Sequence, residues 1–175
     1  MKKLGDNALR KFFSFLAILL IATFPVLGQS GEASSVIGIH IETTFGTSLQ
    51  PDITQVNFID LPVPFQDEWV STPEIITWQL SWRGDFSSKQ KLVCALTAGE
   101  FDCANNLKQI WTSSVGALNQ ELPGPPADGS QMEVALIGSS SGTGTAELQF
   151  QYLNTIDGAA NMWDFEITYT FLNNV

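Results

Sequence analysis

The stretch that decides the fold is MWDFEITYTF, residues 162–171, near the C-terminus. From Trp163 to Phe171 every second residue is aromatic or aliphatic, and the residues between them are acidic or carry a hydroxyl group. Successive side chains of a β-strand point to opposite faces, so this period of two places all the apolar side chains on one face. The pattern predicts a strand that packs its apolar face on a core and turns its acidic and hydroxyl face to water.

The same alternation recurs upstream in segments that turn-rich stretches separate. It predicts strands over residues 37–45, 54–60, 76–83, 91–96, 132–136 and 147–152. No helices alternate with these segments, although residues 104–122 favour one or two helical turns. Burying one face of every strand takes two sheets packed against each other. We therefore expect an all-β fold, an antiparallel two-sheet β-sandwich of the Ig-like or jelly-roll kind, with about 7–8 strands and one short helical turn.

The N-terminal residues have the composition of a secretory signal peptide. Basic residues precede the apolar run Phe12–Phe24, and small or branched residues follow it. The run is shorter than the ~20 apolar residues that a membrane-spanning helix needs, although an uncleaved N-terminal anchor is the alternative. We expect a signal peptide at residues 1–28, a flexible lead-in at 29–35 and one β-sandwich domain at 36–175. The expected location is extracellular, either secreted or at the cell surface.

The charge of the chain becomes strongly acidic once such a leader is removed. The remainder keeps 17 of the 18 acidic residues but only four of the 8 basic ones, a net charge of −13. Nucleic acids and anionic lipids are bound by clusters of Lys and Arg. The sequence holds no such cluster in this part, because the basic residues left are Arg83, Lys89, Lys91 and Lys108. We therefore expect no nucleic-acid partner and no anionic lipid partner.

The two cysteines, Cys94 and Cys103, both lie in the part that is expected to be exported. Thiols are oxidised in extracellular compartments, so we expect one disulfide between them. Such a bond closes a short loop, and it would fix a hairpin or loop rather than the whole fold. The spacing contains no Cys-x-x-Cys motif, which argues against a metal or redox role.

No arrangement of residues typical of catalysis accompanies the strands. His40 is the single histidine, and it falls on the polar face of the first strand beside Glu42. Asp164 and Glu166 project from one strand face about 7 Å apart, as the carboxylates of a glycosidase can. Outward carboxylates are also ordinary on a soluble sheet, and no cleft is predicted that would raise the pKa of one of them. We expect a protein without enzymatic activity.

The segment 154–161 gathers oxygen-bearing side chains around Gly158. Calcium prefers six to eight oxygen ligands, so Asp157, Asn161 and Asp164 are a candidate calcium site. Asn, Asp and Gly are also the usual residues of turns, and a plain turn is the alternative. Apart from calcium, no cofactor is expected.

Five tryptophans raise the question of sugar binding, because aromatic rings offer a flat apolar face to a ligand. Trp78, Trp82 and Trp163 fall on the apolar faces of predicted strands and are expected in the core. Trp69 and Trp111 lie in less regular segments, where a ring can face solvent. These two are the candidate ligand-binding residues.

The alternating segments at the two ends of the chain bear on assembly. The first strand, residues 37–45, and the closing strand, residues 163–171, resemble the terminal strands of chaperone-usher pilins. The resemblance implies a subunit whose first strand completes a sheet of its neighbour by β-strand addition. Pilins usually place their disulfide early and a tyrosine near the extreme C-terminus, whereas here the cysteines are central and six residues follow Tyr169. The alternative is a first strand paired within its own chain.

These observations lead to two expectations about function. The first is a structural or adhesive component of a cell surface or extracellular matrix, which self-associates or binds other surface proteins. The second is a module that binds a glycan or another small ligand, with or without calcium.

Overall fold

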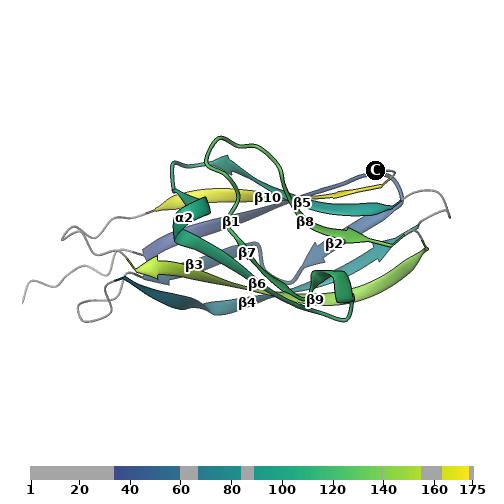
Figure 1. The fold of residues 1–175 in the computed structure, drawn as a ribbon, viewed down its shortest axis with the longest axis horizontal. Helices are drawn as coiled ribbons and strands as arrows, with labels where there is room; N and C mark the ends of the chain where they lie inside the picture. Colours follow the sequence, from purple (N-terminus) through teal and green to yellow (C-terminus); the bar gives the residue numbers. More distant parts are fainter. Residues whose placement is uncertain (1–33, 60–66, 84–88, 139, 155–162, 174–175) are drawn as a thin grey trace, which may run out of the picture. The chain divides into compact units, whose positions relative to one another are not determined.

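The stretch that decides the fold forms β10, the middle strand of a five-stranded sheet, sheet A. The computed structural model describes residues 34–59, 67–83, 89–138, 140–154 and 163–173, all within the unit Ala33–Val175. Sheet A has the order β3-β1-β10-β5-β8 (Figure 1). Its strands are β1 (Ser34–Thr43), β3 (Gln55–Ile59), β5 (Gln90–Ala98), β8 (Met132–Ile137) and β10 (Asp164–Leu172).

The second five-stranded sheet, sheet B, has the order β2-β4-β9-β6-β7. Every pair of neighbouring strands in it is antiparallel. Its strands are β2 (Thr47–Pro51), β4 (Glu68–Trp82), β6 (Leu107–Ser113), β7 (Gln120–Pro123) and β9 (Gly142–Asn154). The expectation of an all-β fold with two sheets is therefore confirmed, with ten strands in the described residues instead of about 7–8.

Sheet A departs from the expected antiparallel order at one pair of strands. β1 runs parallel to β10, with Ile37 opposite Phe165 and Ile39 opposite Ile167. The other pairs of this sheet are antiparallel. β1 is thus paired on both sides within its own chain, between β10 and β3.

Residues 104–122, for which the sequence favoured one or two helical turns, lie mostly in strands. Only α2 (Cys103–Asn106) and the 3₁₀ turn η1 (Gly116–Leu118) are helical there, and β6 and β7 take the rest. In β6 the side chains of Leu107, Gln109 and Trp111 are buried, and those between them are not. A period of two in burial outweighs the weak helical spacing of the same residues. No helix in the described parts of the chain is long and apolar enough to cross a membrane.

Side chains from the two sheets contact each other in one buried cluster. The ring of Trp78, on β4, lies 5.3 Å from that of Tyr169, on β10, between centroids. Phe58, on β3, lies 4.6 Å from Tyr152, on β9. Both pairs join sheet A to sheet B, so the alternating apolar faces of the sequence share a core.

The polar face of β10 is less exposed than its pattern predicts. Asp164 is exposed, but Thr168 and Thr170 are buried, with 6% and 8% of their surface exposed. The hydroxyl of Thr168 lies 2.8 Å from that of Thr97, and Thr170 donates to a carboxylate oxygen of Glu42. β10 has a strand on each side, and side chains of both neighbours cover its hydroxyl groups. The expectation of a wholly water-facing polar side is wrong at this end of the strand.

Candidate functional site

The predicted disulfide is absent, because Cys94 and Cys103 are both free thiols. Both side chains are buried, and burial raises the pKa of Cys94 to about 11 and that of Cys103 to about 12. The amide nitrogen of Gln109 donates to the sulfur of Cys94 at 3.5 Å. Oxidation proceeds through the thiolate, which burial disfavours at neutral pH. The expectation of a disulfide is therefore corrected to two protected thiols in the core.

The candidate calcium site falls mainly outside the described residues. Asp157 and Asn161 belong to the segment 155–162, and Asp164 is exposed at the start of β10. Within the described ranges, no group of three or more His, Cys, Asp or Glu side chains is placed to hold a metal ion. Calcium binding by these three residues remains a prediction.

The two candidate tryptophans have different environments. Trp111 is only 3% exposed, with its ring centroid 5.9 Å from that of Trp78 and 5.8 Å from that of Tyr169. It occupies a core position of β6, so it offers no ring face to a ligand in solution. Trp69 is 38% exposed, near the start of β4. Of the two, Trp69 alone is at the surface.

The aromatic residues expected in the core also include two that are only partly buried. Trp78 is fully buried, whereas Trp82 and Trp163 pack on the edge of the core. Trp82 is the last residue of β4, and it lines a surface hollow. His40 is exposed on β1, as expected.

Trp69 forms part of a small polar and aromatic cluster. The ammonium nitrogen of Lys108 lies 4.5 Å from the centroid of the Trp69 ring. The same nitrogen is 2.8 Å from a carboxylate oxygen of Glu121, on β7. A cation at this distance is attracted to the face of an indole, and the carboxylate holds the cation in place. A hollow of about 350 Å³ adjoins the cluster and is also lined by Asn105 and Leu122.

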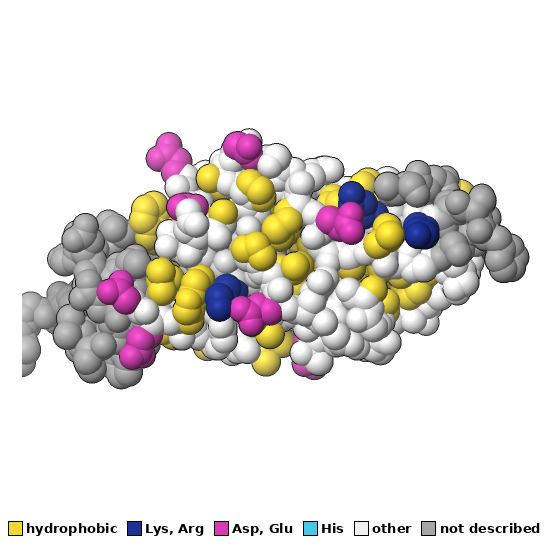
Figure 2. Space-filling view, in the orientation of Figure 1, with side chains coloured by type: hydrophobic (Ala, Val, Ile, Leu, Met, Phe, Trp, Pro, Cys, Tyr) yellow, Lys and Arg dark blue, Asp and Glu magenta, His cyan; other side chains and the backbone are white. Residues whose placement is uncertain are grey.

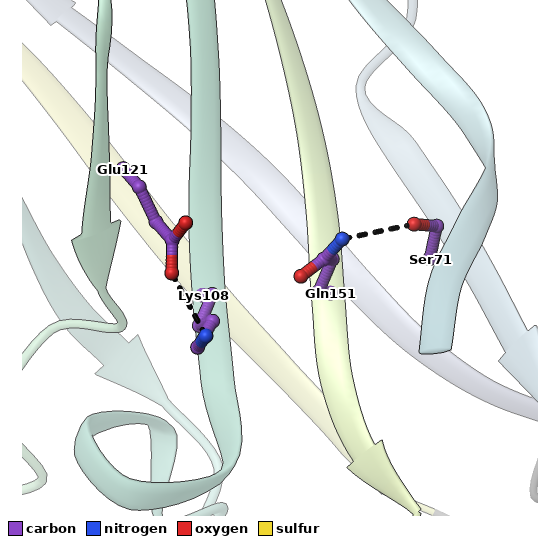
Figure 3. Close-up of polar contacts among 4 residues, drawn as sticks. All are labelled: Ser71, Lys108, Glu121 and Gln151. Carbon is purple, nitrogen blue, oxygen red and sulfur yellow. Dashed lines mark hydrogen bonds and ion pairs between the residues drawn. The ribbon is translucent and has the colours of Figure 1, made fainter. Parts of the chain in front are cut away.

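The cluster continues across sheet B in a row of polar side chains. Lys108 is opposite Gln151 on β9, and Gln151 is opposite Ser71 on β4. Figure 3 shows the Lys108–Glu121 ion pair beside the hydrogen bond from the Gln151 amide to the Ser71 hydroxyl, which measures 3.2 Å. These side chains come from four adjacent strands, and all lie on the side of sheet B opposite the core.

A β-bulge in β4 sets the position of Trp69 and Ser71. The pairing with β9 shifts between Ser71 and Ile75, where Pro73 lacks an N–H group for the ladder. The hydroxyl of Thr72 donates to the carbonyl oxygen of Phe150, and the amide of Gln149 donates to the carbonyl oxygen of Thr72 at 2.9 Å. These two side-chain hydrogen bonds replace the backbone hydrogen bonds that are missing at the bulge. They hold the first part of β4 against β9.

The whole side of sheet B that faces away from the core, here called the outer face, is rich in uncharged polar groups. Its hydroxyl and amide residues on β2, β4, β6 and β9 alternate with core residues, and they are Ser48, Gln50, Ser71, Thr77, Gln79, Ser81, Thr112, Thr143, Thr145, Gln149 and Gln151. At the described outward positions of its strands the charged residues are Lys108, Glu121 and Glu147, and Arg83 follows β4 directly. Figure 2, in the orientation of Figure 1, shows Asp and Glu side chains and a few Lys and Arg side chains spread among hydrophobic and uncharged polar ones.

Sequence reasoning found Trp69 but missed the partners that surround it. Lys108, Glu121 and Gln151 each lie on a different strand, and only the strand order brings them together. A usable signal was present in β9, where the polar positions of the alternation are mostly Thr and Gln instead of charged residues. No protein-family model matches the chain, and no curated protein matches it either.

Proposed function

We propose that the two sheets form a β-sandwich and that the protein is a non-enzymatic, exported adhesive module that binds a neutral glycan on the outer face of sheet B. The support for the sandwich is the shared core of the two sheets. The support for binding is the cluster of Trp69, Lys108 and Glu121 beside its hollow. This cluster carries the proposal.

The chemistry of the cluster suits a sugar. A pyranose ring has an apolar face that an exposed indole can cover, and hydroxyl groups at its rim that need hydrogen-bond partners. Around Trp69 those partners are the ammonium group of Lys108, the carboxylate of Glu121 and the amide of Asn105. Ligand sites combine apolar contact with a few convergent polar groups in this way.

The charge of the protein favours a neutral glycan over an acidic one. The carboxylate of Glu121 neutralises Lys108 within the cluster. The acidic residues of the chain outnumber the basic ones, 18 against 8. A polyanion would meet repulsion from the whole molecule and find no unpaired cation in this cluster.

Assembly through the first strand is less favoured by the arrangement of β1. Donation of β1 to a neighbour would break its pairing with both β10 and β3. The strands at the sheet edges in the described residues, β2, β3, β7 and β8, have at most 6 residues each. β2 and β7 each end in a proline. Short edges and prolines are features that discourage edge-to-edge pairing.

A glycan array probed with the full chain tests the proposal. We expect binding to one or more neutral glycans, and a loss of at least tenfold in affinity for Trp69→Ala. Leu136→Ala is the matched control, because Leu136 is 42% exposed on β8 in sheet A and does not line the hollow. Absence of binding to every neutral glycan, or binding that Trp69→Ala leaves unchanged, would contradict the proposal.

A further inference from the structure

Two further hollows lie at the end of the outer face opposite the Trp69 cluster. One has a volume of about 660 Å³ and is lined by Phe45, Trp82 and Arg83, among others. The other, of about 370 Å³, is lined by Gln50, Gln79 and Thr145. Ser48, Ser81 and Thr143 line both hollows, so the two join into one trough over β2, β4 and β9.

The trough has a fixed aromatic wall. The indole nitrogen of Trp82 donates to the carbonyl oxygen of Ser140 at 2.6 Å. A Cβ atom built on Gly142 would lie 2.6 Å from the Cζ2 atom of Trp82, so glycine is what allows the ring to lie this close to β9. Phe45 is 95% exposed at the rim. An indole held in this way loses little conformational freedom when a ligand covers it.

Like Gln151 and Ser71 in the row beside Trp69, the polar side chains that line the trough are mostly uncharged. Apart from Arg83, its polar side chains are hydroxyl and amide groups without charge. Between the two sites, β4 and β9 present Thr77 and Gln149 on the same face. The outer face therefore offers hydrogen-bond donors and acceptors along its length, with the Trp69 cluster near one end and the trough near the other. The ring of Trp82 borders the trough from the core side of sheet B, where its centroid lies 6.4 Å from that of Phe171.

The separation of the Trp69 cluster and the trough decides what ligand can contact both. Trp69 and Trp82 lie near opposite ends of β4, which runs from Glu68 to Trp82. At ~3.3 Å per residue, the stretch of β4 between these two residues spans about 40 Å. No monosaccharide or disaccharide reaches both sites at once, whereas an extended polymer does.

We infer that the ligand of the outer face is a linear neutral polysaccharide, which contacts the Trp69 cluster and the Trp82 trough at the same time. The inference rests on the proposed function and assigns its ligand class. Two linked contacts raise affinity by making the second one intramolecular, so a chain that reaches both sites binds more tightly than a short one. Neither site needs to be strong by itself.

The experiment measures affinity against chain length by isothermal titration calorimetry. The probes are graded oligosaccharides of neutral β-glucan, xylan, mannan and chitin, and the soluble polymers where they exist. We expect the affinity for at least one series to rise more than tenfold between the shortest oligomers and the chains that span the face. The double variant Gln79→Ala/Thr145→Ala removes two exposed trough residues and should abolish this gain. It should leave binding of the short oligomers unchanged.

Two controls separate a failure of this inference from a failure of the proposed function. Trp69→Ala should lower the affinity for short and long oligomers alike. Leu136→Ala, at an exposed position of β8 in sheet A, should change neither. If short oligomers bind through Trp69 but affinity is independent of length, or if the trough variant keeps the gain, the inference is overturned and the proposed function stands. If no neutral glycan binds at all, both are overturned.

Discussion

The hydroxyl of Tyr169 donates a hydrogen bond of 2.7 Å to the side-chain oxygen of Gln109. Tyr169 lies on β10 in sheet A and Gln109 on β6 in sheet B, and both are fully buried. The amide nitrogen of Gln109 donates in turn to the carbonyl oxygen of Pro123 at 3.0 Å. Because a buried polar group without a partner is costly, this bridge favours one alignment of the two sheets over others.

Replacement of Tyr169 by phenylalanine should destabilise the protein by about 1–3 kcal/mol. The variant keeps the aromatic ring and its contacts, but it leaves the oxygen of Gln109 buried without a donor. The free energy of unfolding from urea titrations measures the effect. A loss below about 0.5 kcal/mol, which is typical of surface substitutions, would contradict the importance of this bond.

The double variant Tyr169→Phe/Gln109→Leu is the control for this effect. Replacement of both partners by apolar groups removes the unpaired oxygen, so the double variant should lose less stability than the sum of the two single variants. Strict additivity would show that the two side chains act independently.

The thiols of Cys94 and Cys103 should react very slowly in the native protein. Both are buried, and the pKa values of about 11 and 12 leave almost no thiolate at neutral pH. Titration with a thiol reagent should detect almost no reaction in buffer and two thiols per chain in denaturant. If fewer than two thiols per chain react in denaturant without a reductant, the cysteines are oxidised.

The same thiols predict how stability depends on pH. An unfolded cysteine ionises near pH ~8.5, whereas burial holds the proton on both folded thiols to about pH 11 or 12. Above the unfolded pKa the unfolded chain binds fewer protons than the native one, so stability falls as pH rises. We expect the free energy of unfolding to be insensitive to these groups below about pH 8 and to decline from about pH 9 upward.

Variant Cys94→Ala/Cys103→Ala isolates the contribution of the thiols. Its stability should decline less steeply above pH 9, by up to about 1.4 kcal/mol per pH unit for each thiol removed. Burial also raises the pKa of Tyr169 well above its usual value, so a residual decline is expected at higher pH. Equal slopes in the variant and the parent protein between pH 9 and 10 would rule out the thiols as the cause.

The elements that the sequence predicted well are those with several buried side chains in alternation. β10, β9 and the second half of β4 show this pattern over many residues, and all are strands. β2 and β7 were missed because each is a short edge strand with at most one buried side chain, too few to produce a period. The parallel pairing of β1 with β10 has no local signal, because it depends on which strands become neighbours.

The candidate site could be predicted only in part for a similar reason. Both Trp69 and Trp111 lay in segments without a clear pattern, yet one is at the surface and the other is 3% exposed. The difference follows from the register of β6 and from the bulge in β4, and neither can be read from composition. The Lys108–Glu121 pair likewise depends on strand order, because the two residues approach each other through pairing of β6 with β7.

The side-chain hydrogen bonds at the bulge in β4 give a prediction about stability. Thr72→Val removes the buried hydroxyl that donates to the carbonyl oxygen of Phe150, and it should cost about 1–2 kcal/mol in unfolding free energy. Thr77→Val, at an exposed position of the same strand, should change stability by less than about 0.5 kcal/mol. Equal effects of the two variants would show that the side-chain bonds at the bulge are unimportant.

Gly99, which follows β5, should tolerate replacement by alanine poorly. Its φ of +87° lies in the left-handed region, and an added Cβ atom would lie 2.5 Å from the Cβ atom of Phe165 and 2.6 Å from the carbonyl oxygen of Asp164. Strained backbone and overpacking add, so Gly99→Ala should destabilise the protein by roughly 2–4 kcal/mol. Gly116→Ala is the matched control, because an added Cβ atom there meets nothing within 4 Å. It should be neutral or slightly stabilising, since alanine restricts the unfolded chain. Urea midpoints of the two variants that differ by less than experimental error would show that the start of β10 yields to the added methyl group.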